Sequence, residues 1–157
     1  NANINFNHYS SSPISITNNV KVITSPHGHP GGASSIRVEI DRFSVTYVTD
    51  CEHPESHLNQ NVIDIAKNTD ILIHDAQYTP EQIPNYKGWG HSSWKHCIEV
   101  ASKAKAKKLV LFHHNPDHGD SILESIEQDA KKIFENTVSA REGMEIFIPE
   151  EVSETVI

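Results

Sequence analysis

Imidazole and carboxylate side chains stand at the ends of four predicted strands, and these side-chain types bind catalytic metal ions. The residues concerned are His27, His29, Asp50, His74, Asp75, His113 and His114. Strand ends are rigid platforms, so they can aim side chains from distant parts of the chain at one point. The spacing is too wide for a local finger or a single helix, so any shared site must be built by the fold.

A mixture of neutral imidazole and carboxylate suits Zn²⁺, Mn²⁺ or Fe²⁺. An open site of this kind lowers the pKa of a bound water to about 7, which is the chemistry of a hydrolase. The sequence has 11 histidines in 157 residues. A histidine taken alone is more often a surface or hydrogen-bonded loop residue than a ligand, so the argument depends on the set.

The charge balance argues against a protein that binds nucleic acid over a broad surface. The formal net charge is −8, with 13 Lys and Arg against 21 Asp and Glu, whereas phosphate binding needs clustered cations. Cys51 and Cys97 form no CxxC pair, which indicates a reducing compartment, and we expect the cytoplasm. We expect no membrane association, because no apolar run approaches the roughly 20 residues that a bilayer requires.

The hydropathy pattern predicts a β-rich first part followed by alternating helices and strands. Strands are expected at 20–24, 35–40, 43–49, 70–76, 108–114 and 144–149, with at most a short edge strand near 14–16. Helices are expected at 55–68, 91–108 and 120–134, the first with Pro54 in its first turn and the last opened by a capping box from Ser121 to Glu124. This order predicts one α/β layered domain over residues 1–157.

Five segments taken together resemble the C-terminal part of the metallo-β-lactamase-fold hydrolases. They are "HPGGASSIRVEI", "FSVTYVTDCEH", "DILIHDAQYTPEQ", "GWGHSSW" and "KLVLFHHNPDHGD". The phosphodiesterase branch, which includes ribonuclease Z and cyclic phosphodiesterases, is the most similar, and the resemblance covers about residues 20–135. It implies the C-terminal half of a four-layer αββα sandwich, in which a mixed sheet is flanked by helices and two divalent metal ions bind at one edge.

The same resemblance implies roles for individual residues. His29 corresponds to the third histidine of the first metal site, Asp50 to the carboxylate that bridges both metals, and His113 to the terminal histidine of the second. His91 resembles the histidine that these phosphodiesterases place near the scissile phosphate. Asp50 and His91 would thus serve catalysis, with hydroxide held between two metal ions, zinc in the first place and manganese or iron as alternatives.

The first metal-binding signature of the family, HxHxDH, does not occur in this sequence. We therefore expect either the C-terminal piece of a once-complete hydrolase or a natural short protein that lost catalysis. The expected partners are the missing N-terminal half, a separate partner chain or a second copy in a homodimer.

Several neighbouring residues have two readings. His27 is either an alternative ligand to His29 or an outer residue. His114, Asp117 and His118 either orient ligands or form a polar turn. Asp75 either fixes the tautomer of a ligating histidine or caps the next loop.

A second group of residues flanks the expected site. Glu52 and His53 either face the substrate or belong to a solvated loop. Trp89 could line a pocket for a ring, whereas Trp94 and Cys97 are expected in the core.

Two classes of function follow from this sequence. The first is a metal-dependent hydrolase, in which a small cyclic or linear phosphodiester is favoured over a folded RNA, while carbonyl substrates such as β-lactams and thioesters remain open. The second is a non-catalytic fold half or interaction module without a complete metal site.

Overall fold

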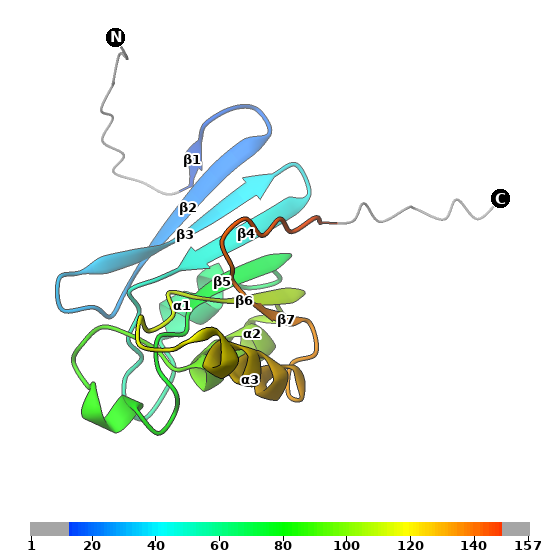
Figure 1. Ribbon diagram of the computed structural model, residues 1–157. Helices are drawn as coiled ribbons and strands as arrows, with labels where there is room; N and C mark the ends of the chain where they lie inside the picture. The colour runs from blue at the N-terminus through cyan, green and yellow to red at the C-terminus, as the bar shows by residue number, and fades with distance from the viewer. Residues whose placement is uncertain (1–12, 149–157) are drawn as a thin grey trace, which may run out of the picture.

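The computed structural model describes residues 13–148, which share one seven-stranded sheet in the order β1 to β7 (Figure 1). The strands are β1 Ile14–Ser15, β2 Val20–His27, β3 Ala33–Ile40, β4 Phe43–Val48, β5 Ile71–Asp75, β6 Lys108–Phe112 and β7 Thr137–Ser139. Strands β1 to β4 are antiparallel neighbours, whereas β4 to β7 run parallel. The expected α/β class with a mixed sheet is confirmed.

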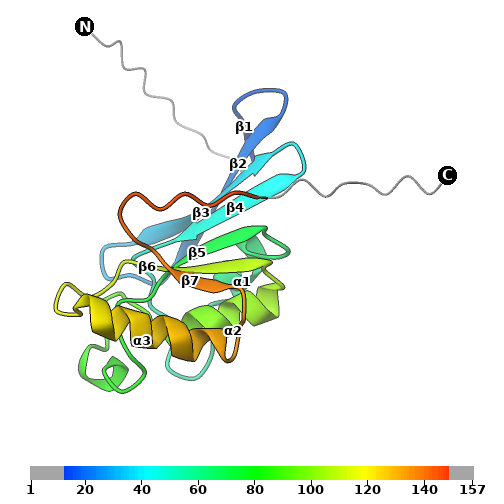
Figure 2. The same ribbon diagram turned by 45° about the vertical axis from the view of Figure 1, so that its right-hand side comes forward.

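Three α-helices cover one face of the sheet (Figures 1 and 2). They are α1 Gln60–Ile65, α2 Trp94–Ala104 and α3 Asp120–Lys131, and a short 3₁₀ helix, η1 Ile83–Asn85, lies in the loop before α2. The parallel strands require such crossovers, because a tight turn cannot join parallel neighbours. The crossovers bring the carboxyl ends of β4, β5 and β6 to one edge.

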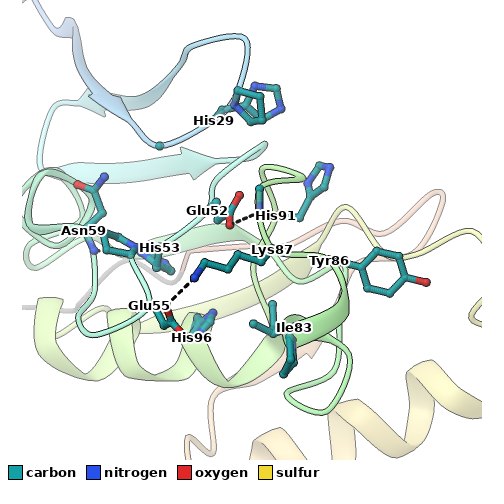
Figure 3. Close-up of a pocket in the computed structure, with 15 residues that line it drawn as sticks. His29, Glu52, His53, Glu55, Asn59, Ile83, Tyr86, Lys87, His91 and His96 are labelled. Carbon is teal, nitrogen blue, oxygen red and sulfur yellow. Dashed lines mark hydrogen bonds and ion pairs between the residues drawn. The ribbon is translucent and has the colours of Figure 1, made fainter.

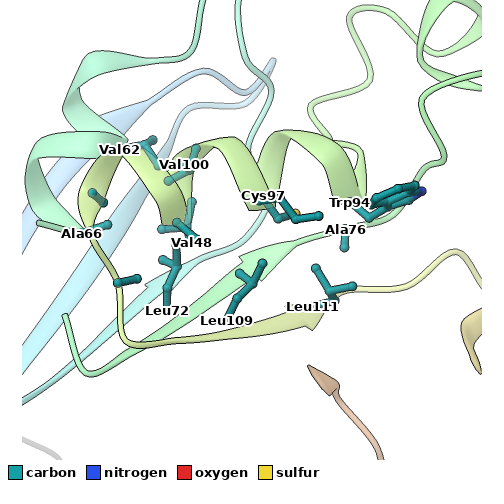
Figure 4. Close-up of a cluster of buried hydrophobic side chains, with 14 of the residues drawn as sticks. Val48, Val62, Ala66, Leu72, Ala76, Trp94, Cys97, Val100, Leu109 and Leu111 are labelled. Atoms are coloured by element: carbon teal, nitrogen blue, oxygen red, sulfur yellow. The ribbon is translucent and has the colours of Figure 1, made fainter. Parts of the chain in front are cut away.

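The core lies between the sheet and α1 and α2 (Figure 4). Leu72, Leu109 and Leu111 point from neighbouring strands at Val100 and other apolar residues of α2, and all four are fully buried. Trp94 and Cys97 belong to the same cluster, as the helical spacing predicted. Burying a side chain of this size stabilises the fold by about 2 kcal/mol, so this layer fixes the strand ends firmly.

The opposite face of the sheet is apolar and carries none of the helices formed by residues 13–148. Cross-strand register places Ile36 beside Tyr47 and Ile40 beside Phe43. Ile36 is 39% exposed, Ile40 46% and Tyr47 39%. A sheet with both faces apolar is built to be covered on both.

The structure corrects the bounds of three predicted elements and the cap of a fourth. The segment 144–148 forms no strand, and residue 149 lies outside the described residues; the last strand is instead Thr137–Ser139, which pairs with β6. The helix expected at 55–68 is limited to Gln60–Ile65, because the side chain of Asn59 caps its start.

The other two corrections concern the later helices. The helix expected at 91–108 runs from Trp94 to Ala104, and its capping box joins Ser93 and His96. Gly119 is the N-cap of α3 and makes no side-chain cap bond, so the capping box expected at Ser121 and Glu124 is wrong. Within residues 13–148, every helix is too short or too polar to cross a bilayer.

Candidate metal centre

Asp50, His91 and His113 converge at the edge where the parallel strands end. Asp50 follows β4, His113 follows β6, and His91 lies on the loop before α2. One ligand atom from each lies within 4.8 Å of the others. Asp50 Oδ1 is 3.4 Å from Nε2 of His113. The fold therefore brings together three of the residues that the sequence singled out.

Asp50 and His113 both have left-handed backbone conformations, with φ of 54° and 56°. Each is a short step beyond its strand, where the chain must turn away from the sheet. Aspartate and histidine tolerate this region better than most residues, but it still costs about 1 kcal/mol relative to an ordinary conformation. Strained backbone held in place by its surroundings is common at functional sites.

His29 lies next to this group on the loop between β2 and β3. Its Nδ1 accepts a hydrogen bond from the backbone N–H of Gly31 at 3.2 Å, and the Nε2 side of its ring lies against Gly90. Its ring centroid is 6.1 Å from that of His91. Gly90 makes this approach possible, because a Cβ there would lie 2.2 Å from Cδ2 of His29, and its φ of +91° also favours glycine.

Asp75 fixes the orientation of His91. Its buried Oδ2 accepts from Nδ1 of His91 at 2.8 Å and from the N–H of Cys51 at 3.3 Å, while Oδ1 accepts from the N–H groups of Gln77 and Ser92. The hydrogen bond to Asp75 raises the pKa of His91 above its usual value. Nε2 of His91 remains directed at the strand-end group, where it can hold or donate a proton.

His27 lies behind the group. Its Nε2 donates to the carbonyl oxygen of Asp50 at 3.1 Å, so its Nδ1 accepts from the hydroxyl of Ser35 at 2.8 Å. Burial lowers the pKa of this imidazole and keeps it neutral. With both ring nitrogens occupied, His27 supports the backbone of Asp50 and has no free ring nitrogen for a metal ion.

Glu52 joins the loops that carry the candidate ligands. Its carboxylate accepts from the backbone N–H groups of Gly88 at 2.7 Å and Gly90 at 2.8 Å, while its own N–H donates to the carbonyl of Gly28 at 2.8 Å (Figure 3). Both oxygens are therefore engaged with the loop that leads to His91. Glu52 sets the position of that loop.

His114 and His118 lie apart from the strand-end group. Both ring nitrogens of His114 are buried without a partner in the described part of the chain, and Nε2 of His118 lies 3.3 Å from the side-chain nitrogen of Gln82. Trp89 is 62% exposed and packs edge-on against Tyr86 at 5.3 Å.

A second group, Cys51, His53 and His74, was not predicted. Potential ligand atoms of the three lie within 4.8 Å of one another, and all three residues are buried. His53 Nδ1 accepts from the N–H of Asn59, so its Nε2 carries the hydrogen, whereas His74 Nδ1 donates to the carbonyl of Asp75 and leaves a lone pair on Nε2. In these tautomers Nε2 of His53 carries a hydrogen, so only His74 offers a lone pair, and neither Nε2 has a hydrogen-bond partner among the described residues.

Burial keeps these two imidazoles neutral. Desolvation, reinforced by neighbouring histidines, lowers the pKa of His53 to about 2, and desolvation lowers that of His74 to about 4. Sequence spacing gives no signal for this pair, because the two rings meet from a loop and a strand.

The strand-end group, in contrast, fits a divalent metal ion. Asp50, His91 and His113 offer one carboxylate and two imidazoles, and the side chains of Asp50 and His113 are 46% and 39% exposed. His29 lies beside them but does not belong to the set whose ligand atoms lie within 4.8 Å of one another. Such nitrogen and oxygen donors suit Zn²⁺, Mn²⁺ and Fe²⁺.

Comparison with known protein families identifies a domain over most of the chain. Residues 6–114 match the beta-lactamase superfamily domain. The chain is 38% identical over 96 residues to ribonuclease Z of Archaeoglobus fulgidus, covering 59% of this chain and 30% of that protein. It is 41% identical over 81 residues to ribonuclease Z of Sulfurisphaera tokodaii, covering 52% and 26%.

Solved structures show the same fold. The metallo-beta-lactamase fold protein YhfI from Bacillus subtilis superposes with a TM-score of 0.67 and 20% identity, covering 82% of this chain and 48% of that one. The short form of human tRNase Z superposes with a TM-score of 0.66 and 18% identity, covering 87% and 45%. The chain thus spans less than a third of these two ribonuclease Z sequences and about half of these two structures.

Proposed function

The chain belongs to the beta-lactamase superfamily, and from this premise we propose that it forms part of a metal-dependent phosphodiesterase. The convergence of Asp50, His91 and His113 at the strand ends carries the proposal. Similarity to proteins named ribonuclease Z supports phosphodiesters over carbonyl substrates.

His29, Asp50 and His113 would hold the metal, with Asp50 as the bridge if two ions bind. When bound, the ions would supply the charge that activates water and stabilises the phosphoryl oxygens. The residues present provide half of such a site. The remaining ligands would come from the rest of the fold.

His91 would act as the proton donor to the leaving group. Asp75 orients its ring through Nδ1, so Nε2 faces the reacting centre. A positioned imidazole of this kind contributes typically about 10²–10⁴-fold to a rate. His27 and Glu52 would support this arrangement from the Asp50 backbone and the glycine loop.

The open apolar face of the sheet would pack against the other half of the fold. Its exposed isoleucines and Tyr47 lie on the face opposite the helices. An exposed apolar sheet face of this kind promotes association with other proteins. A partner chain or a second copy would therefore cover it if the other half of the fold were absent. The free, buried state of both cysteines is in keeping with the cytoplasmic location that we propose.

The net charge favours a small or locally bound phosphodiester over a folded RNA, because a charge of −8 repels an extended phosphate backbone. The second candidate function is a non-catalytic module. In its favour, the buried Asp75 carboxylate that contacts His91 also accepts three backbone N–H groups, which gives it a structural use without catalysis.

The test is metal content together with hydrolysis in the complete protein. Elemental mass spectrometry should find one to two equivalents of metal per chain, and bis(p-nitrophenyl) phosphate should be cleaved. His113→Gln and Asp50→Asn should each lose metal and activity. His57→Gln, on an exposed histidine, is the matched control and should retain both. Full metal content and activity in His113→Gln would refute the assignment.

A further inference from the structure

A cavity of about 400 Å³ lies at the amino ends of the parallel strands, at the edge of the sheet opposite the candidate metal centre. Phe43, Ile71 and Lys108, which begin β4, β5 and β6, line it. Lys108 begins β6 and His113 follows its last residue, and a strand rises about 3.3 Å per residue, so about 15 Å separates the cavity from the metal centre. The volume suits a small molecule, because such sites commonly measure about 300–1,000 Å³.

Apolar side chains form much of the lining. Besides Phe43 and Ile71, they come from the segment 146–148, which passes the cavity without forming a strand. Ile71 is buried, whereas Phe147 is 82% exposed, so its ring is available to contact an occupant. An occupant with an apolar body would cover this surface, and the burial of apolar surface is favourable.

The carboxylate in the lining is already neutralised. Among residues 13–148, Asp70 is the only acidic residue that lines the cavity. Its Oδ2 accepts hydrogen bonds from the backbone N–H and the hydroxyl of Ser44, at 2.7 and 3.1 Å. Its Oδ1 lies 3.0 Å from the ammonium nitrogen of Lys107, with which it forms an ion pair. An anion in the cavity therefore meets a paired carboxylate rather than a free one.

Two cations of the lining keep their charge. The guanidinium of Arg42 lies over the ring of Phe43, 5.0 Å from its centroid, and forms no ion pair within residues 13–148. Nζ of Lys108 donates to the uncharged amide oxygen of Asn136 at 2.6 Å, and the amide nitrogen of Asn136 donates to the carbonyl of Lys107 at 2.6 Å. These contacts position both cations without neutralising them. The cavity is thus positively charged in a protein whose formal net charge is −8.

A positively charged and partly apolar cavity selects an amphipathic anion. Hydrogen bonds between a cation and a carboxylate are roughly twice as strong as those between neutral groups. The planar guanidinium of an arginine also matches the two oxygens of a carboxylate. Because the unpaired cations are few, a singly charged carboxylate suits the cavity better than a multiply charged phosphate, part of whose charge would be desolvated without a partner.

We propose that this cavity binds an organic acid, with its carboxylate between Arg42 and Lys108 and its apolar body against Phe43, Ile71 and Phe147. The site is separate from the metal centre, so this inference does not rest on the proposed function. It gives the protein a second ligand, held at the far end of the strands that carry the metal centre.

The test is isothermal titration calorimetry of the complete, metal-loaded protein with naphthylacetate and, separately, with its neutral analogue naphthylacetamide. The acid should bind saturably at one equivalent. The amide should bind about tenfold more weakly or worse, because it lacks the charge that both cations recognise. Raising the salt concentration should weaken the binding of the acid and leave that of the amide unchanged.

Arg42→Gln and Lys108→Gln should each weaken the binding of the acid by about tenfold and leave the binding of the amide nearly unchanged. Arg141→Gln is the matched control, because the side chain of Arg141 is 59% exposed and lies outside the cavity lining. This control variant should bind the acid as the wild type does. Phe147→Ser should weaken the binding of both ligands, and it leaves the core intact because Phe147 is 82% exposed.

A further variant, His113→Gln, distinguishes this cavity from the metal centre, where a carboxylate could also bind. It should bind the acid as the wild type does. Binding of the acid that is lost in His113→Gln but kept in Arg42→Gln would overturn the proposal, and so would equal affinities for the acid and the amide. If neither ligand binds, the proposal is refuted, and the remainder of the complete chain is then the better occupant of the cavity.

Discussion

Two buried neutral imidazoles should make the stability of this protein strongly dependent on acid. His53 and His74 have pKa values lowered to about 2 and about 4, against 6.5 for an ordinary histidine. Below pH 6.5 the unfolded chain therefore binds protons at these positions that the folded chain does not bind. The stability contribution is complete above pH 6.5 and is lost as the pH falls towards the folded-state values.

The magnitude follows from the shift. Between pH 6 and pH 5 an unfolded histidine with a pKa of 6.5 gains about 1.2 kcal/mol of proton-binding free energy that a buried neutral one does not. His53 and His74 together should therefore lower the free energy of unfolding by about 2.4 kcal/mol over this interval. His53→Gln cannot titrate, so it should reduce the loss by about 1.2 kcal/mol relative to the wild type.

The assay is urea denaturation at pH 6 and pH 5 after metal removal by a chelator, followed through the fluorescence of the buried Trp94. The comparison uses the change between the two pH values, so the direct cost of the substitution cancels. His57→Gln, on an exposed histidine only four residues away, should behave as the wild type. An equal pH-dependent loss in His53→Gln and the wild type would refute the reasoning.

Three further substitutions probe the loops around the metal centre. Gly90→Ala should destabilise the fold by about 1 kcal/mol or more and lower the metal content, because the added Cβ would meet the ring of His29. Gly143→Ala is the control for the backbone cost in a thermal melt, because Gly143 also has a positive φ, +75°, but open space around it. This control variant should keep its metal. Asp75→Asn should lower the free energy of unfolding, measured in denaturant, by about 2–4 kcal/mol, because an amide cannot accept all four hydrogen bonds. A loss below about 0.5 kcal/mol would contradict the hydrogen bonds described for Asp75. Glu52→Gln leaves only one oxygen for the two glycine N–H groups, so amide exchange at Gly90 should accelerate and kcat should fall, and unchanged protection would argue against the clamp.

The sequence predicted strands correctly where a segment with alternating apolar and polar residues pairs with an adjacent strand in the sheet. The hairpin of residues 35–40 and 43–49 appears as β3 and β4. The segment 144–148 has a similar pattern but is no strand, because the position beside β6 belongs to the three-residue strand Thr137–Ser139. A strand so short carries too few alternations to be recognised.

The sequence singled out Asp50, His91 and His113, which the fold brings together, but it did not single out the contacts that support them. Asp50 and His113 stand at strand ends that the hydropathy pattern located. The clamp from Glu52 to Gly90 and the meeting of His53 with His74 depend on how loops pack across the sheet edge. No local periodicity encodes such contacts, so only the folded structure reveals them.

The left-handed backbone at Asp50 and His113 favours glycine, whereas the proposed metal site needs the side chains of these two residues. Glycine at either position would relieve the conformational cost while removing a side chain of the proposed metal site, so the most stable sequence for these two turns is one without that site. A library selected only for heat resistance should accumulate glycine at both turns. Directed evolution of this protein therefore needs metal retention as a selected trait from the first round.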